Sequence, residues 1–510
     1  MPEYTAPGVY VEENAVTSAA IEGVSTSTAA FLGETVRGPV RPILVTSVVE
    51  YQRWFGGELG ADRYLPDAVR GFFANGGRRV VIARVVSRSA ATAQADCGAS
   101  FTLRAVGPGA WGARVFVMIG ESTKQVSSPA GLLPVGLRVR VAYYDAVPPE
   151  GPCDWFAGVA NATSPAHFEE FDNLVVDATG PDGWERWLNG SSLIELDRSA
   201  PGLNGGPPDR GLYRLAGGSD GTSALDAVDF QGQPDGVDGF AQGLEALSGE
   251  TYREVSVVHA PAASFEVARA IIEHCERLRY RFAIIDAGPG PLAPGFDPRS
   301  AIADSTRAAL YHPWIEVADP SGAPQRRQVP PGGCIAGIYA RTDSQRGVHK
   351  APANEIVVGA LGLTAAIGQA TDDALNLRHV NVIRSLAGRG IRVMGARTLS
   401  SDAEWKYVNV RRLLIYLERS IDEGTQWVVF EPNSCPLWTK AVNAIERFLL
   451  ECWRSGALQG RKPEEAFFVR CDETTMTQDD IANGRLICLI GVAPIKPAEF
   501  LIFRVGQRTA

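Results

Sequence analysis

The clearest hydrophobic pattern in the chain lies between residues 391 and 433. After an extended apolar segment at 391–394, apolar residues recur with the spacing of one helix face, at Val410, Leu413, Leu414, Leu417 and Ile421. Ser401–Glu404 matches the S-x-x-E capping box and predicts the start of this helix. Gly424 predicts a left-handed helix end, and Thr425–Phe430, rich in β-branched and aromatic residues, predicts a strand that ends before Pro432. The expected unit is strand, helix, strand.

Short apolar runs alternate with helical patterns over much of the remaining chain. Strands are expected at 29–32, 43–45, 79–86, 255–258, 282–285, 314–317, 334–339, 466–471, 485–493 and 499–505. Helices are expected from Ser47 to about Gly56, and at 64–75, 264–279, 299–310 and 437–455. This alternation is typical of an α/β layer, with mixed α+β character towards the end of the chain.

The middle of the chain has a different composition. Two strands are expected at 101–105 and 114–119, and from 121 to 249 the sequence is rich in Gly, Pro, Ser and Asp with only short apolar runs. This pattern predicts an inserted β-rich domain with long loops on the outside of the molecule. Residues 1–25 hold too few apolar side chains for a core of their own, so they are expected to form an extended arm.

Composition narrows the function classes. The chain has 510 residues, enough for two to four domains, and a formal net charge of −9 that argues against a general binder of nucleic acid or membrane surfaces. The N-terminus lacks the apolar core of a signal peptide, and the longest apolar run, 356–368, is too short to span a bilayer, so synthesis in the cytoplasm is expected. The eight cysteines contain no C-x-x-C pair, so mostly buried, reduced thiols are expected.

Two glycine-rich motifs were weighed as catalytic or cofactor sites. Residues 107–112 match G-x-G-x-x-G but precede a strand, whereas a dinucleotide site must open a helix. Residues 217–221 match G-x-S-x-G and leave an α/β serine hydrolase using Ser219 as the alternative function, although no buried helix pattern follows. A tight turn is the favoured interpretation. With no H-x-x-x-H pair and no P-loop, no catalytic, cofactor or metal site is predicted.

One stretch inverts the acidic character of the chain. Between Ala374 and Ser401 there are five basic residues and no acidic one: Arg378, Arg384, Arg389, Arg392 and Arg397. Arginines can extend from strand edges and loops without a further role. The alternative is a basic surface that faces an acidic partner.

Several of these segments resemble one family. The segment GARTLSSDAEWKYVNVRRLLIYLERSI (395–421), together with PGVYVEE (7–13), GALQGRKPEEAFFVRCDETT (456–475) and GVAPIKPAEFLIFRVGQ (491–507), closely resembles tail sheath proteins of contractile phage tails and related injection particles. The resemblance covers about 1–115 and 250–510. It implies a structural subunit, without enzymatic activity or cofactor, that polymerises helically in six-fold rings around an inner tube. Contraction would drive the tube through a target envelope.

The resemblance also implies a division of the chain and a set of partners. The expected parts are an arm (1–25), sheath core (26–118), inserted outer domain (119–250), core (251–375), inner domain (376–497) and a second arm (498–510). The arms are expected to pair with other subunits through Val9, Tyr10, Val11, Glu12 and Glu13 and through Phe500, Leu501, Ile502, Phe503 and Arg504. The five arginines are candidates to face the tube. Expected partners are other copies, the tube, and baseplate and tail terminator or cap proteins, without nucleic acid or membrane insertion. Assembly is expected in the bacterial cytoplasm.

Overall fold

The computed structural model describes residues 20–98, 101–129, 131–147, 152–174, 190–196, 208–222, 224–293, 295–320, 322 and 324–499. By their contacts these residues divide into two compact units. The larger contains residues 25–412, and the smaller combines 20–24 with 413–499.

The larger unit is built on a nine-stranded sheet with the order β18-β21-β20-β15-β14-β13-β1-β3-β2. Neighbouring strands run parallel from β20 to β3, and both ends of the sheet are antiparallel. All residues of β1, β3, β14 and β15 are buried, as expected for central parallel strands. The strands are β1 (Ala29–Gly33), β2 (Ile43–Val45), β3 (Val80–Arg84), β13 (Val257–His259), β14 (Phe282–Asp286), β15 (Ala308–His312), β18 (Glu355–Ile356), β20 (Val380–Leu386) and β21 (Gly390–Val393).

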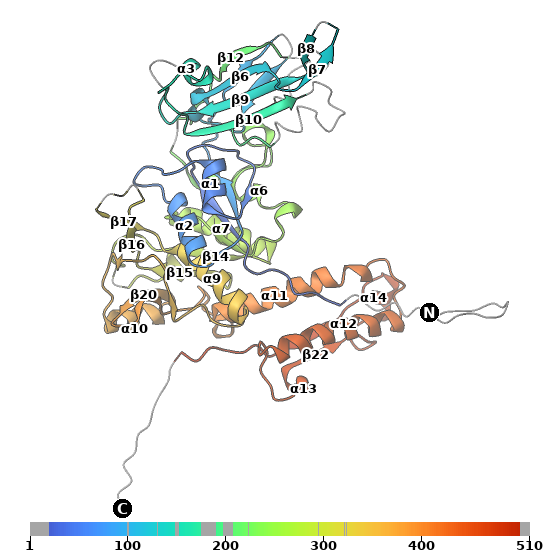
Figure 1. Cartoon of the computed structure of the whole chain (residues 1–510). Helices are drawn as coiled ribbons and strands as arrows, with labels where there is room; N and C mark the ends of the chain where they lie inside the picture. The colour runs from blue at the N-terminus through green and yellow to red at the C-terminus, as the bar shows by residue number, and fades with distance from the viewer. Residues whose placement is uncertain are drawn as a thin grey trace, which may run out of the picture. The chain divides into compact units, whose positions relative to one another are not determined.

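Helices cover both faces of this sheet (Figure 1). Because side chains alternate across a strand, Ala30 joins the apolar cluster under α7 (Phe265–Leu278), while Phe31 meets Phe72 of α2 (Leu65–Ala74) on the opposite face. Helix α9 (Gly332–Arg346) lies on the same face as α2, where Tyr339 packs against Phe282. The other helices are α1 (Val48–Phe55), α5 (Ala227–Gln231), α6 (Gly243–Ala246), α8 (Pro298–Ala301), α10 (Gln369–Leu377) and the 3-10 turns η2 (Val237–Gly239) and η3 (Glu250–Tyr252). The predicted mixed α/β fold class is confirmed.

Two predicted elements of this unit are wrong. The helix expected at 299–310 ends at Ala301, and Ala308–His312 instead form the buried strand β15 between β14 and β20. The strand expected at 334–339 lies inside helix α9. Small residues let this helix approach α2 closely, since a Cβ on Gly333 would lie 2.4 Å from the Ala68 carbonyl oxygen. In both places a short apolar run carries no period that separates helix from strand.

A small antiparallel sheet adjoins the large one in sequence. Its order is β17-β16-β19, with β16 at Ile315–Ala318, β17 at Arg326–Val329 and β19 at Gly362–Leu363. The strand predicted at 314–317 is therefore confirmed, but it belongs to this sheet rather than to the main one.

The β-rich part of the larger unit has its own sheets and its own core. A four-stranded antiparallel sheet has the order β10-β9-β6-β12 (Figure 1), and a three-stranded one has the order β11-β5-β4. Trp111, Val117 and Tyr143 lie in an apolar cluster that contains only residues of this part. The elements are β4 (Gln94–Asp96), β5 (Thr102–Ala105), η1 (Ala110–Arg114), β6 (Val115–Glu121), β7 (Gln125–Ser128), β8 (Gly131–Pro134), β9 (Leu137–Tyr143), α3 (Cys153–Phe156), β10 (His167–Leu174), β11 (Ile194–Leu196) and β12 (Gly211–Arg214).

The chain enters and leaves the β-rich part at one place. Ala91 and Ser219 exchange two backbone hydrogen bonds, each with an N···O distance of 2.9 Å. The strands expected at 101–105 and 114–119 are present as β5 and β6, and they belong to the β-rich sheets. At the other end, Leu225, Phe230 and Tyr252 pack against the cluster under α7. These contacts place the β-rich part within about 92–218.

The smaller unit is mainly helical. Helix α11 (Val408–Gly424) packs against α12 (Cys435–Arg454), where the Tyr416 and Phe448 ring centroids lie 5.9 Å apart. The segment 20–24 lies along α11, because the Val24 amide donates a hydrogen bond to Ser420 Oγ at 3.2 Å. The remaining elements are α13 (Pro463–Ala466), β22 (Phe467–Arg470), α14 (Gln478–Ala482) and β23 (Leu489–Val492). The predicted long helix at 437–455 and both of these strands are confirmed.

The stretch 391–433 contains three local corrections. No capping box forms at Ser401: Asp402 caps the 3-10 turn η4 (Ala403–Trp405), and α11 begins only at Val408. Gly424 is the last residue of α11 and is not among the left-handed glycines; a Cβ there would lie 2.6 Å from Ile21. The strand predicted at 425–430 is instead the 3-10 turn η5 (Gln426–Val428) in the short connection between α11 and α12. Trp427 and Val428 pack there against Leu437 and Trp438 of α12.

Candidate assembly surfaces and internal sites

The ten arm residues lie outside the described residues. They are Val9, Tyr10, Val11, Glu12 and Glu13 at one end and Phe500, Leu501, Ile502, Phe503 and Arg504 at the other. Their pairing with other subunits stays a prediction, as does the strand expected at 499–505.

The smaller unit contains a sheet of only two strands among its described residues. Within residues 413–499, β22 and β23 form a sheet of two strands, and α12 packs on β22. Phe468 of β22 is 50% exposed and Leu489 of β23 is 53% exposed. Two-stranded sheets are marginally stable in water, and exposed apolar side chains on such a sheet mark a surface for an added strand or partner. The exposed side chains lie in the region that the sequence analysis assigned to the inner domain.

The structure brings three of the five predicted arginines together on the β20–β21 hairpin. Arg384 and Arg392 face each other across it, and Arg389 lies at its tip. Arg389 and Arg392 donate to Asn354, at 2.9 Å to Oδ1 and 2.6 Å to the backbone oxygen.

An acidic side chain and a backbone carbonyl group engage two other members of the set. Arg384 forms an ion pair with Asp372 at 2.6 Å. Arg397 is buried and donates to the Asn376 carbonyl oxygen at 2.7 Å, and Arg378 is the half-buried C-cap of α10. Of the five, Arg389 is exposed and lies beside the half-buried Arg392, and whether these charges face the tube stays a prediction.

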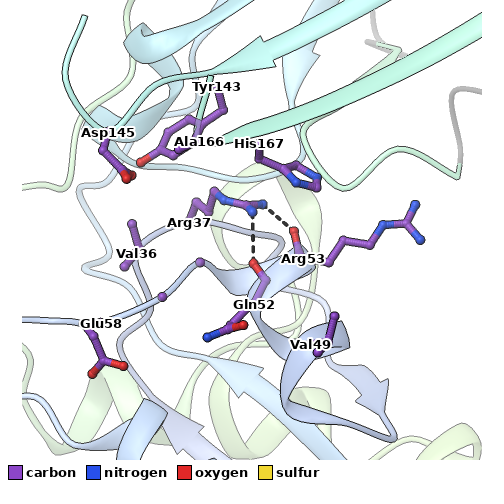
Figure 2. A pocket seen from close by; sticks show the side chains of 12 residues that line it. Val36, Arg37, Val49, Gln52, Arg53, Glu58, Tyr143, Asp145, Ala166 and His167 are labelled. Carbon is purple, nitrogen blue, oxygen red and sulfur yellow. Dashed lines mark hydrogen bonds between the residues drawn. The ribbon is translucent and has the colours of Figure 1, made fainter. Parts of the chain in front are cut away.

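A cavity of about 700 Å³ lies between α1 and the β-rich sheet (Figure 2). Arg37 projects into it and donates to the carbonyl oxygens of Arg53 (2.6 Å), Gln52 (3.0 Å) and Trp54 (3.2 Å) at the end of α1. Its guanidinium lies 5.3 Å from the centroid of the Tyr143 ring. Burial lowers the pKa of Arg37 to about 10, although Tyr143 acts to raise it, so the side chain stays charged at neutral pH. A cation suits the negative end of a helix dipole, and Arg37 thereby fastens the β-rich sheet to α1.

The acidic residue Glu169, on β10 of the β-rich part, lies near Arg37 and acts to raise the pKa of that guanidinium. Burial acts to raise the pKa of Glu169, but hydrogen bonds from His167, Ser191 and Ser192 lower it to about 2. Ser192 donates to Glu169 through its amide at 3.0 Å and its hydroxyl at 2.6 Å. The carboxylate is therefore ionised at neutral pH and holds the Ser191–Ser192 segment on β10.

A deeply buried ion pair joins three distant segments. Arg412, at the start of α11, donates to both carboxylate oxygens of Asp343 on α9, at 2.9 and 2.6 Å. Thr26 contributes its carbonyl oxygen to Arg412 at 3.0 Å and its hydroxyl to Asp343 at 2.7 Å. Burial alone would lower the pKa of Arg412, but Asp343 raises it. Sequence analysis missed this pair, although a charged residue beside the apolar stripe of a helix was a usable signal.

The two glycine-rich motifs do not form catalytic or nucleotide sites. Residues 107–112 lead into the 3-10 turn η1 and then β6, so no helix N-terminus faces a phosphate position. Ser219 Oγ accepts a hydrogen bond from the Gly221 amide at 3.1 Å, and Asp220 accepts one from the Ala110 amide at 3.0 Å. In the part of the chain that the structure describes, no histidine hydrogen-bonds to Ser219. The predicted tight turn is confirmed, and nothing favours the serine hydrolase alternative.

The described ranges contain neither a metal-binding cluster nor a membrane-spanning helix. No group of three or more His, Cys, Asp or Glu side chains there is placed to hold a metal ion. None of the helices in those ranges combines the length and the apolar character needed to cross a bilayer. All eight cysteines are free. Five are buried as predicted (Cys97, Cys275, Cys334, Cys452 and Cys471), whereas the prediction is wrong for Cys153 and Cys435, which are exposed.

Comparison with known proteins identifies relatives over more than half of the chain. The phage tail sheath protein central domain matches residues 237–399, and the phage tail sheath C-terminal domain matches 400–508. A putative prophage major tail sheath protein of Pseudomonas aeruginosa (strain UCBPP-PA14) is 25% identical over 288 residues, which are 56% of this chain and 72% of that protein.

Solved structures show the same fold. The helical sheath of the anti-feeding prophage in its contracted state has a TM-score of 0.58 and 22% identity, covering 99% of this chain and 100% of that one. The sheath complex of an extracellular contractile injection system, PVC, in its contracted state has a TM-score of 0.59 and 21% identity, covering 100% of this chain and 99% of that one.

Proposed function

Because this chain belongs to the phage tail sheath family, we propose that it is a sheath subunit that polymerises helically around an inner tube and contracts to drive the tube through a target envelope. The observation that carries the proposal is the order and extent of the match. Two consecutive sheath domains cover 237–508, and sheath structures superpose along nearly the whole chain. Contraction of this kind is a two-state rearrangement of subunit contacts and needs no nucleotide.

The two-stranded β22–β23 sheet is the proposed acceptor for the arms of neighbouring copies. Each added ladder hydrogen bond contributes about 1 kcal/mol net, whereas ordering an arm costs about 1–2 kcal/mol per residue. Apolar contacts must supply most of the remainder. Val9, Val11, Leu501 and Phe503 are the apolar arm residues available, and Phe468 and Leu489 offer the exposed apolar surface. A single junction is then near neutral, so subunits stay soluble until a lattice is nucleated.

Charge supports the pairing of the two arms in one composite sheet. Residues 1–25 carry four glutamates and no Lys or Arg, whereas residues 485–510 carry four basic residues and one glutamate. Opposite charges on neighbouring strands contribute about 0.2–1 kcal/mol per pair. That is enough to select a register and too little to drive assembly alone.

Deletion of either arm tests the proposal directly. Variants lacking 1–20 or 498–510 should keep the circular dichroism of the full chain yet form no tubes or rings in negative-stain electron micrographs. Normal tubes without both arms would contradict it. In the full chain, Glu12→Arg with Glu13→Arg should impair assembly, and adding Arg504→Glu with Arg508→Glu should partly restore it. If assembly is not restored at any salt concentration, these charged side chains are solvated at the chain ends and do not pair with each other.

The partners proposed for the assembled state are further copies in six-fold rings, the inner tube, and baseplate and terminator or cap proteins. Assembly is proposed to take place in the bacterial cytoplasm, without nucleic acid or membrane insertion. Arg389 and Arg392 of the β20–β21 hairpin are the proposed contact with the tube.

Charge reversal tests the tube contact. Arg389→Glu with Arg392→Glu should weaken sheath–tube association more than sheath–sheath association. Arg210→Glu, on the β-rich part, is the control and should change neither. An equal loss of both associations in the hairpin variant would contradict tube contact.

A further inference from the structure

The β22–β23 hairpin places two cysteines opposite each other. The strands are antiparallel, with facing pairs from Phe467 and Val492 to Arg470 and Leu489. One more step in this register brings Cys471 opposite Cys488. Facing residues in an antiparallel ladder have Cα atoms about 4.5–5.5 Å apart, which lies within the range of about 4.4–6.8 Å that a disulfide spans.

The side chains of the two cysteines also meet. The two thiols lie close enough for each to shift the pKa of the other. Both belong to the apolar cluster around Leu437 and Trp438, where Cys471 is 7% exposed and Cys488 is half-buried. Register and side-chain contact therefore agree that the two sulfur atoms lie close together with both thiols intact.

We propose that Cys471 and Cys488 form a redox-controlled disulfide site that closes the hairpin at its open end. The oxidant is a low-molecular-weight disulfide such as oxidised glutathione. The more exposed Cys488, as thiolate, attacks one sulfur of that disulfide and releases one thiolate, which leaves a mixed disulfide on Cys488. Cys471, as thiolate, then attacks Cys488 sulfur and releases the second thiolate. Two protein thiols are oxidised and one small disulfide is reduced to two thiols.

The bond would constrain a defined segment. It closes the loop 472–487, which contains α14 with its capping box between Thr477 and Asp480. A cross-link across such a loop restricts the open conformations of the hairpin and stabilises the folded one. It also fixes one end of the β22–β23 sheet.

Burial sets the rate of the reaction. Burial raises the pKa of both thiols, that of Cys488 to about 12. Only the thiolate attacks a disulfide, so exchange is slow at neutral pH. While the pH remains below that pKa, each increase of one pH unit raises the thiolate fraction, and therefore the exchange rate, about tenfold. The pair is therefore reduced after synthesis in a reducing compartment and oxidised on prolonged exposure to an oxidising one.

Peptide mapping of the full-length, unassembled chain tests the site. The protein is incubated with excess oxidised glutathione at pH 7.5 and 8.5, alkylated, and digested with trypsin. Cleavage after Arg470, Arg485 and Arg504 places the cysteines in separate peptides, 471–485 and 486–504. We expect a linked pair of these peptides, lighter by two hydrogens than their sum, to form about tenfold faster at pH 8.5. Cys153→Ser and Cys435→Ser, which remove the exposed thiols, should leave the link unchanged.

Two results would overturn the proposal. One is the recovery of both peptides alkylated or glutathionylated but never linked. The other is linkage of either cysteine to a different cysteine or to a second chain. Amide hydrogen exchange of the unmutated protein gives an independent reading: exchange in 472–487 should slow about tenfold or more on oxidation. Unchanged exchange in a fully linked sample would refute the stabilising role. None of these measurements depends on sheath assembly.

Discussion

At the scale of single residues, the Arg412–Asp343 pair is the clearest case in which burial sets the energetic consequence. Each side chain is 4% exposed. Loss of one partner leaves an uncompensated charge in the interior, which costs far more than loss of a solvated pair.

Arg412→Met should reduce the free energy of unfolding by about 3–5 kcal/mol, measured by urea denaturation. Adding Asp343→Leu should recover part of that loss, because the orphaned carboxylate is removed. The control is Arg210→Met, whose partner Glu121 is 56% exposed and whose removal should cost less than about 1 kcal/mol. A loss from Arg412→Met no larger than the control would contradict the assignment of a buried pair.

His274 links stability to pH. Burial first, and then Arg281, lower the pKa of His274 to about 3, and Arg281 donates to its Nε2 at 2.5 Å. The unfolded histidine titrates near 6.5. Between these values the unfolded chain binds a proton that the folded chain does not, so the stabilisation is complete above pH 6.5 and is lost as the pH falls towards 3.

His274→Gln keeps an acceptor for Arg281 and removes the titration. The slope of unfolding free energy against pH between 6 and 4 should therefore decrease by about 1 kcal/mol per pH unit relative to the unmutated chain. Denaturant titrations at three pH values in this range measure it. Identical slopes in both proteins would show that His274 does not control the acid response.

At the scale of elements, the packing of α2 against α9 depends on the absence of side chains. A Cβ on Gly337 would lie 2.4 Å from the Phe72 carbonyl oxygen, and one on Gly71 would lie 2.6 Å from Cys334 Sγ. The Phe72 carbonyl oxygen belongs to the helix backbone, so it cannot move aside as the end of a flexible side chain can. The two helices therefore fit together only while these positions remain glycine.

Gly337→Ala should lower the free energy of unfolding by about 1–3 kcal/mol, because the added methyl group forces the helices apart. Gly249→Ala is the matched control, since nothing lies within 4 Å of a Cβ there and its φ of −68° suits any residue. Thermal and urea unfolding of both variants provide the measurement. Equal stability of the two variants would mean that the helices can separate without cost.

At the scale of the whole molecule, the β-rich part is attached through one pair of adjacent chain segments. The hydrogen bonds between Ala91 and Ser219 hold its entry and exit together, and its apolar cluster is separate from the one under α7. The sheath-family domain matches begin only at residue 237. The separate apolar cluster and the single crossing point favour a part that folds on its own core.

Replacement of 92–218 by a short Gly/Ser linker should leave the rest of the chain folded and able to form tubes. Replacement of 119–250, the boundaries predicted from sequence, is the comparison. That deletion truncates β6, removes its partner β9, and removes α5 and α6, whose region packs against the cluster under α7. Circular dichroism and electron microscopy should show a folded, assembling protein only for the first deletion. Failure of both, or success of both, would contradict the inferred boundary.

The sequence by itself determined the elements with a distinct period or a long apolar run. The helical stripe from Val410 to Ile421 and the buried runs that became β1 and β3 needed no tertiary information, because their patterns are local. Motifs spread along the chain likewise sufficed for the family resemblance.

Only the tertiary structure decided the short ambiguous runs and the long-range pairs. Residues 308–312 and 334–339 took opposite forms to those predicted, because the neighbouring strand or helix selects the conformation when the run itself has no period. The pairing of Arg412 with Asp343 and the facing of Cys471 and Cys488 depend on chain folding that brings distant residues together. No local pattern encodes such a contact, because its energy appears only after both partners have been placed.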